Sequence, residues 1–173
     1  MKYIILHHSA ITGYIPQFTK IDSIHYRKKF PKSSLGFHGG YHYLVEKEVG
    51  VFQYRREDAR GAHTNAYKDG EHLNDVSIGI CLSGDFTRED IQERQLIELE
   101  RIVSGVQKRH KIPFKNILLH RDVKATACPG VDLKALIKEL RGRVGLHPRT
   151  SLERRLERAK KAIKRVKPAR KRL

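Results

Sequence analysis

Short apolar runs, separated by polar and glycine-rich segments, make up most of the first 140 residues. Residues 3–6 and 77–82 are almost continuously apolar, which is typical of strands buried on both faces of a sheet. Apolar residues on both sides of Gly50 predict a hairpin. We therefore expect strands at residues 3–6, 41–45, 51–54, 77–82 and 116–119.

Apolar residues spaced three or four positions apart predict helices between these strands. We expect helices at residues 21–30, 87–110 and 132–140. Pro31 would end the first helix because proline cannot continue it, while Thr87 and Asp132 would cap the other two. Strands that alternate with helices indicate an α/β fold, with a central mixed β-sheet flanked by helices.

The pattern changes beyond Gly145, where basic residues become dense. Apolar residues recur there at helical spacing and stop before Pro168; they are Leu152, Leu156, Ala159, Ile163 and Val166. This spacing among Arg and Lys side chains predicts a C-terminal basic amphipathic helix. We therefore divide the chain into a first domain, residues 1–142, and a basic helical tail, residues 143–173.

Most of the formal net charge of +17 belongs to the tail. Residues 141–173 hold 14 Lys and Arg side chains but only two carboxylates. Such a helix suits an anionic membrane surface, lipopolysaccharide or another polyanion; the alternative is a solvated helix that packs on the first domain. The tail has no aromatic side chains to stack on bases, which makes nucleic acid a less favoured partner.

Targeting signals and disulfides are not evident in the sequence. The apolar run after Met1 is too short for a secretory leader and ends at His7. The sequence also contains no run of about 18 apolar residues, the length that crosses a membrane as a helix. We therefore expect synthesis in the cytoplasm. The two cysteines make no disulfide framework, since Cys81 lies in a predicted core strand and Cys128 precedes Pro-Gly in a loop.

Three residues with metal-binding side chains follow the ends of predicted strands. His7 ends the first strand, His120 ends the last, and Cys128 lies shortly beyond His120. Two imidazoles and a thiolate suit zinc, an ion of intermediate softness that binds nitrogen and sulfur. Three protein ligands leave a fourth position open, which is typical of catalytic zinc sites.

Five separated blocks of sequence occur in the order and spacing of one protein family. They are Leu6–Ala10, Gly40–Tyr43, Gly61–Thr64, Asn74–Ile80 and His120–Gly130. The chain thereby resembles the zinc-dependent N-acetylmuramoyl-L-alanine amidases of the phage-lysin and peptidoglycan-recognition-protein superfamily. The resemblance covers roughly residues 1–140 and implies the mixed sheet with flanking helices of that superfamily.

The resemblance implies roles for individual residues. It makes His7, His120 and Cys128 the zinc ligands, in agreement with their chemistry. Tyr41 matches the tyrosine that these amidases place beside the reacting water, where a phenol can donate a hydrogen bond to developing negative charge. His8 would point to the opposite face of the strand and serve as a core residue or as support for the ligands.

Thr126 departs from the phage pattern, in which a lysine often stands two residues before the cysteine ligand. Threonine can donate a hydrogen bond to an oxyanion but brings no charge, so the proton shuttle stays open, with Lys124 as a nearby candidate. His63 resembles the histidine of the cleft that contacts substrate, with a structural role as the alternative. The resemblance implies that Asn74 orders the loop around the cleft.

The implied function is hydrolysis of the amide between N-acetylmuramic acid and L-alanine in peptidoglycan. A small monomer with a basic tail and no leader looks most like a phage or prophage endolysin that reaches the wall after release. The alternatives are a cytosolic amidase that recycles muropeptides and a peptidoglycan-binding module without turnover. The presence of Cys128 favours an enzyme over the binding module.

Overall fold

The computed structural model describes residues 1–13, 16–48 and 50–146. Residues 1–138 form one compact unit, and a second unit begins at Glu139. The predicted basic helix between Thr150 and Pro168 lies outside the described residues and stays a prediction. None of the helices in the described ranges is both long and apolar enough to span a bilayer.

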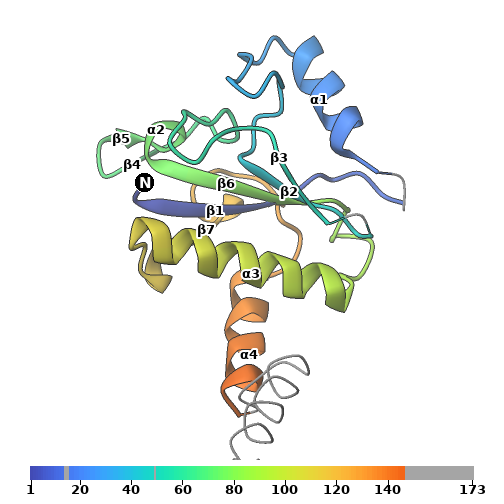
Figure 1. Cartoon of the computed structure of the whole chain (residues 1–173), viewed down its shortest axis with the longest axis vertical. Coiled ribbons are helices and arrows are strands. Elements are labelled where there is room, and N and C mark those ends of the chain that lie inside the picture. Colours follow the sequence, from blue (N-terminus) through green and yellow to red (C-terminus); the bar gives the residue numbers. More distant parts are fainter. Residues whose placement is uncertain (14–15, 49, 147–173) are drawn as a thin grey trace, which may run out of the picture. The chain divides into compact units, whose positions relative to one another are not determined.

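A five-stranded mixed sheet forms the centre of the first unit (Figure 1). In spatial order its strands are β3 (Val51–Gln53), β2 (Tyr43–Val45), β6 (Ser77–Leu82), β1 (Tyr3–His8) and β7 (Ile117–Leu119). β6 runs parallel to β1 and β2, β7 runs parallel to β1, and β2 and β3 form an antiparallel hairpin. The predicted mixed sheet is confirmed, and β1 continues two residues further than expected, through His8.

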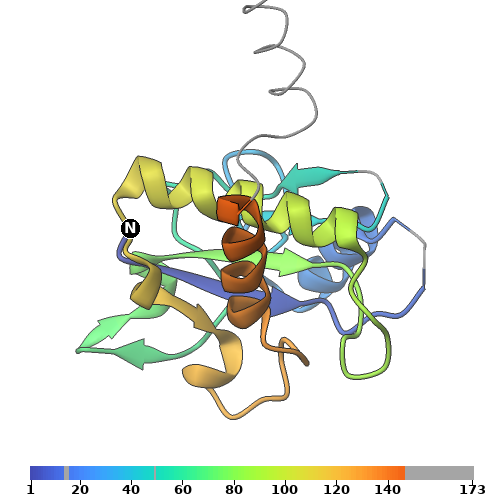
Figure 2. The same cartoon turned by 90° about the horizontal axis from the view of Figure 1, so that it is seen from below.

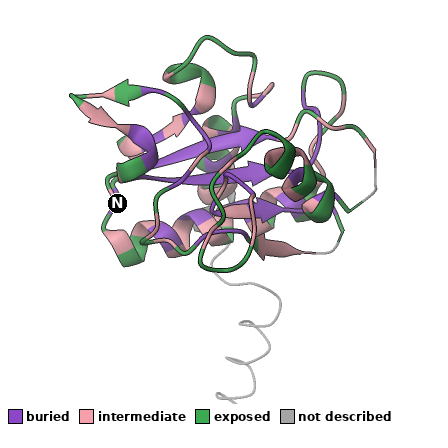
Figure 3. Cartoon of the chain, turned by 90° about the horizontal axis from the view of Figure 1, so that it is seen from above, coloured by how far each residue is buried: buried purple, intermediate pink, exposed green. Residues whose placement is uncertain are grey.

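Burial explains why two strands have continuous apolar sequences. Every residue of β1 and β6 is buried (Figure 3). One face of the sheet packs against α3 (Glu93–His110), which runs roughly along the direction of the strands in Figure 2. Leu99, Val103 and Val106 of α3 are fully buried there, and burying each of them contributes roughly 1.5–3 kcal/mol.

Helix α3 begins at Glu93, so the predicted start at Thr87 was wrong. The hydroxyl and the backbone N–H of Thr87 both donate to the Asp85 carboxylate, at 2.6 and 3.1 Å. Because these bonds fold residue 87 back on the preceding turn, its side chain cannot cap a helix. Gln92 stands at the N-terminus of the helix instead.

Helix α1 (Phe18–Arg27) begins and ends three residues earlier than predicted. Its N-terminus is capped from far along the chain, because the Glu46 carboxylate accepts hydrogen bonds from the backbone N–H groups of Gln17 and Phe18 at 2.6 and 2.8 Å. A carboxylate also suits the positive end of the helix. The helix ends before Lys29, whose backbone is in the left-handed conformation with φ of 58°.

The remaining elements that the structure describes are helix α4 (Leu133–Leu146) and several shorter segments. Helix α4 follows Asp132, whose carboxylate accepts from the Ala135 N–H at 2.9 Å, so the predicted cap is confirmed. Elements that the sequence analysis did not predict are the hairpin β4 (Tyr67–Lys68) and β5 (Glu71–His72), helix α2 (Leu73–Val76), and 3-10 turns at Phe114–Asn116 and His120–Asp122.

Candidate metal centre

Alternation along β1 sends His7 and His8 to opposite faces of the sheet. His7 is 1% exposed and lies beside Cys81, its neighbour on β6. His8 lies on the other face, where its Nδ1 accepts a hydrogen bond from the backbone N–H of Phe86 at 3.2 Å. His8 is therefore a buried residue next to the centre, as the strand pattern predicts.

The segment after β7 brings His120 and Cys128 to His7. The Asp122 carboxylate accepts from the Leu119 N–H at 2.8 Å, and the Cys128 carbonyl accepts from the Arg121 N–H at 2.9 Å. These bonds fold the loop back toward the strand end. The ligand atoms of His7, His120 and Cys128 lie within 4.8 Å of one another.

The donor atoms of these three residues fit a metal ion. Cys128 Sγ lies 3.8 Å from His7 Nδ1, and it also accepts from the His8 backbone N–H at 3.4 Å. The buried Nε2 of His120 has no hydrogen-bond partner among the described residues. A buried nitrogen without a partner costs free energy that a metal ion at this point would recover.

Burial sets the protonation of the three side chains. It lowers the pKa of His7 well below 6.5, and it lowers the pKa of His120 to about 4, with a further contribution from Lys124. Both imidazoles are therefore neutral at pH 7, the form that binds metals. Burial raises the pKa of Cys128 to about 11, so metal binding has to release the thiol proton.

Tyr41 lies beside the centre, in the bend before β2. Its ring centroid is 5.1 Å from that of His7, and it lines a pocket of about 410 Å³ together with His120 and Cys128. Burial, followed by the nearby cysteines, raises the pKa of Tyr41 well above 10. The phenol therefore keeps its proton and can act as a hydrogen-bond donor.

Thr126 and Lys124 lie in two different hollows that share His120 as a wall. Thr126 lines the pocket of Tyr41, where its hydroxyl accepts from the Cys128 N–H at 3.2 Å and keeps its own proton to donate. Lys124 lines an adjoining cleft of about 400 Å³. The structure thus bonds Thr126 to the backbone of Cys128 and puts Lys124 in the adjoining cleft.

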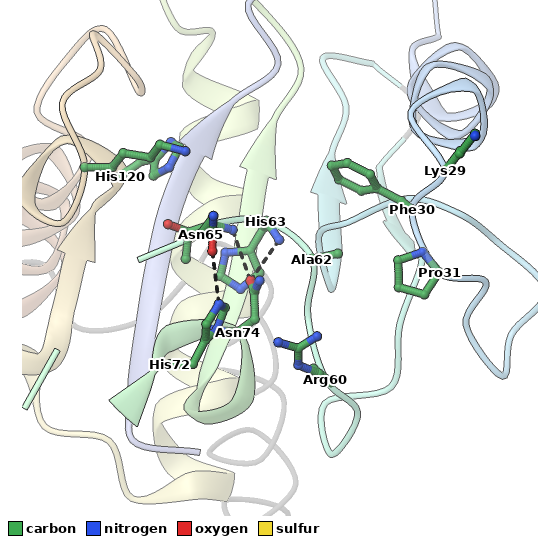
Figure 4. Close-up of a pocket in the computed structure, with 12 residues that line it drawn as sticks. Lys29, Phe30, Pro31, Arg60, Ala62, His63, Asn65, His72, Asn74 and His120 are labelled. Carbon is green, nitrogen blue, oxygen red and sulfur yellow. Dashed lines mark hydrogen bonds between the residues drawn. The ribbon is translucent and has the colours of Figure 1, made fainter. Parts of the chain in front are cut away.

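His63 and Asn74 line the same cleft as Lys124 (Figure 4). The Asn74 side-chain oxygen accepts from the backbone N–H groups of His63 and Thr64, both at 3.0 Å. His63 is 8% exposed, and its Nδ1 lies 3.1 Å from Nε2 of His7. His63 therefore contacts a candidate ligand as well as the cleft.

Two further cleft residues were not singled out from the sequence. Thr64 is buried, and its hydroxyl has no partner within the part of the chain that the structure describes. Arg60 lines the cleft and pairs with the Asp75 carboxylate at 2.6 Å. Thr64 belongs to the same sequence block as His63, and this could have marked it as a cleft residue. Arg60 could not be found in this way, because its place in the cleft depends on the fold of the loop.

Comparison with known proteins settles the family. A family model described as N-acetylmuramoyl-L-alanine amidase matches residues 1–131. The chain belongs to this amidase family. It is 30% identical over 102 residues to an endolysin of Enterobacteria phage K11, a match that covers 57% of this chain and 64% of the phage protein. The chain thus spans less than two thirds of that relative's length.

Solved structures share the fold of the amidase family. An N-acetylmuramoyl-L-alanine amidase from Clostridium intestinale matches with a TM-score of 0.62 at 26% identity, over 81% of this chain and 85% of the other. The ectodomain complex of peptidoglycan recognition proteins LCa and LCx, bound to tracheal cytotoxin, matches with a TM-score of 0.61 at 28% identity, over 79% and 80%. The predicted family and fold are confirmed.

Proposed function

We propose that this chain is a zinc amidase that hydrolyses the bond between N-acetylmuramic acid and L-alanine in peptidoglycan. The observation that carries the proposal is the convergence of His7, His120 and Cys128 within 4.8 Å. Two neutral imidazoles and one sulfur are the donor set of a catalytic zinc site. Membership of the amidase family supplies the reaction class.

The protein's own groups prepare this site for a metal ion. When bound, zinc would polarise the scissile carbonyl and lower the pKa of the attacking water. His7 and His120 present neutral nitrogens, and Cys128 gives up its proton to become a thiolate. The buried position of His7 in β1 keeps bulk water away from one side of the site.

Tyr41 and Thr126 are the candidates that stabilise negative charge on the reacting oxygen. Both line the pocket at Cys128, and both hydroxyls can donate. A donor aimed at developing charge accelerates acyl transfer without changing its own protonation state. Neither residue is a strong base, so their role is hydrogen bonding rather than proton removal.

The cleft beyond His120 suits the peptide stem of the substrate. Lys29, Arg60 and Lys124 line it and carry positive charge, which complements the carboxylates of a stem peptide. His63 and Asn74 line the same cleft, and Figure 4 shows them together with Lys29 and Arg60. Peptidoglycan recognition proteins LCa and LCx, which share the fold, have been solved with bound tracheal cytotoxin, and this supports the proposal.

In a cell, the proposed role is that of a phage or prophage endolysin, made in the cytoplasm and acting on the wall after release. The phage relative supports this role. The likeness to recognition proteins favours a second candidate, a peptidoglycan-binding module without turnover. In either case, we propose that the basic tail binds an anionic membrane surface, lipopolysaccharide or another polyanion.

Product analysis tests the reaction. The zinc-assayed full chain is incubated with purified peptidoglycan and with soluble muropeptide, with and without a chelator. We expect new L-alanine amino termini that disappear with the chelator and return when zinc is added. A protein that holds zinc, binds peptidoglycan and releases no amino termini would be the binding module instead.

Neutralising the tail tests its role separately. Replacement of the Lys and Arg residues between 149 and 171 by Gln should leave hydrolysis of soluble muropeptide unchanged. The same change should weaken lysis of permeabilised cells and lessen its dependence on salt, because it removes most of the excess charge. Equal lysis by both proteins would leave the tail without a targeting role.

A further inference from the structure

A chain of hydrogen bonds runs from His7 away from the metal centre. His7 Nε2 lies 3.1 Å from His63 Nδ1, and His63 Nε2 lies 3.4 Å from the Ser77 hydroxyl. That hydroxyl donates in turn to the Leu73 carbonyl at 2.5 Å. All four residues are buried, so water does not compete for these bonds.

The direction of donation follows from the far end of this chain. Ser77 commits its proton to the Leu73 carbonyl, so toward His63 its hydroxyl can only accept. His63 Nε2 therefore carries the hydrogen, and Nδ1 of the neutral ring accepts one from His7 Nε2. This leaves His7 Nδ1 without a hydrogen, facing the Cys128 sulfur at 3.8 Å.

The reverse direction would block the metal centre. A hydrogen on His63 Nδ1 would be donated to His7 Nε2, so a neutral His7 would carry its own hydrogen on Nδ1. His63 Nε2 would then be an acceptor facing a hydroxyl whose proton is already used. The arrangement seen here avoids both conflicts.

Two glycines hold the His63 ring in place. A Cβ added at Gly79 would lie 2.5 Å from the ring, and one added at Gly61 would also lie 2.5 Å from it. No side chain larger than hydrogen fits at either position unless the ring moves. The ring therefore lies in a slot between β6 and the loop of Gly61, with both nitrogens engaged.

We propose that His63 is a positioning residue for the metal, which fixes His7 in the tautomer that binds through Nδ1. Ser77 sets the tautomer of His63, and the slot of Gly61 and Gly79 sets its orientation. Partners of this kind orient ligands and tune metal affinity. The proposal rests on the proposed zinc site and assigns His63 a role distinct from binding substrate.

The engagement of both ring nitrogens separates this role from substrate binding. His63 lines the cleft, but Nδ1 faces His7 and Nε2 faces Ser77. The ring therefore offers the cleft carbon atoms rather than a free hydrogen-bonding nitrogen. A residue that acted only on substrate would change KM and leave zinc affinity unaltered.

Zinc affinity of the full chain, measured by competition with a chelator, tests the proposal. His63→Leu removes the acceptor and should weaken zinc binding by roughly 10- to 100-fold. His63→Asn offers a carbonyl oxygen near the place of Nδ1 and should recover most of that loss. The absorption spectrum of the cobalt-loaded protein should shift in the Leu variant and return toward the original in the Asn variant.

Two further variants separate positioning from general destabilisation. Gly61→Ala pushes the ring without altering its chemistry and should also weaken zinc binding. Ser83→Ala removes a buried hydroxyl that accepts from the Lys47 N–H at 3.1 Å and should leave zinc affinity unchanged. If His63→Leu fails to fold, Gly61→Ala decides.

Three outcomes would overturn the proposal. Wild-type affinity in both the His63→Leu and the Gly61→Ala variant would show that His7 needs no such partner. An equal loss in the Ser83→Ala control would show that the effect is general destabilisation. A wild-type chain that binds no zinc would remove the metal centre, and this role with it.

Discussion

The two sides of the candidate metal centre are built in different ways. On the strand side, His7 lies inside buried β1, and its second nitrogen is bonded to His63 at 3.1 Å. On the loop side, His120 and Cys128 come from the segment that follows β7. There, His120 has a buried nitrogen that finds no partner within the described ranges of the chain, and Cys128 keeps a proton on its sulfur.

This difference shows where the metal has most to contribute. On the strand side, Nε2 of His7 is bonded to His63 before any metal binds, so this side is preorganised. The loop side carries an unpaired nitrogen, which costs about 1–3 kcal/mol, and a thiol that must be deprotonated. We therefore expect metal binding to stabilise mainly the loop side, which carries His120 and Cys128.

Removal of the loop-side sulfur should have the largest effect. We expect Cys128→Ala to abolish turnover and to lose most of the zinc, a larger loss than the roughly 10- to 100-fold that indirect changes cost. Metal analysis and the amino-terminus assay measure both. Cys81→Ala, the control at the chain's other cysteine, should keep stoichiometric zinc. A Cys128→Ala protein with full zinc and full rate would make the ligand assignment wrong.

The next largest effect concerns a donor rather than a ligand. Tyr41→Phe should keep zinc bound and lower kcat by about 10²- to 10³-fold, because one donor to the developing charge is lost. Tyr43→Phe is the control, since its hydroxyl donates to Glu57 at 2.6 Å and faces away from the centre. Equal rates in the two variants would return Tyr41 to a packing role.

Asn74 stabilises the segment that carries His63, the residue that supports His7 on the strand side. Asn74→Ala leaves the backbone N–H groups of His63 and Thr64 without their acceptor and should cost about 2 kcal/mol of stability. Urea unfolding of the metal-free protein measures this cost. Asn65→Ala, an exposed neighbour in the cleft, should change stability by no more than about 0.5 kcal/mol. Equal costs would remove the special role of Asn74.

A further prediction concerns the pH dependence of the stability of the metal-free protein. Burial lowers the pKa of His42 and of His25 to about 4, whereas an unfolded histidine titrates near 6.5. The unfolded chain therefore binds more protons, and stability should fall as the pH drops from about 6.5 toward 4. Urea midpoints across this range measure the slope, and His25→Gln should make it shallower. An unchanged slope in that variant would contradict the assignment.

The sequence predicted the strands and the grouping of the three candidate ligands, because the signals were local. Residues 77–82 form an unbroken apolar run and are a strand with the same bounds. His7 and His120 follow apolar runs and lie in the family blocks, so they could be singled out as candidate ligands without a structure.

Features that depend on distant contacts were not predictable. Helix α1 starts at Phe18 because Glu46, 28 residues away in sequence, caps it. Threonine often caps helices, but the hydroxyl of Thr87 donates to the Asp85 carboxylate instead. The contact of His7 with His63 depends on the slot at Gly79, which no local pattern reveals.

The central claim is that one metal ion joins the strand side to the loop side. Anomalous diffraction at the zinc edge, from crystals of the zinc-loaded full chain, tests it most directly. We predict a single strong peak between His7 Nδ1, the His120 ring and Cys128 Sγ. A zinc-loaded protein with no peak there, or with its peak bound by other residues, would contradict the account.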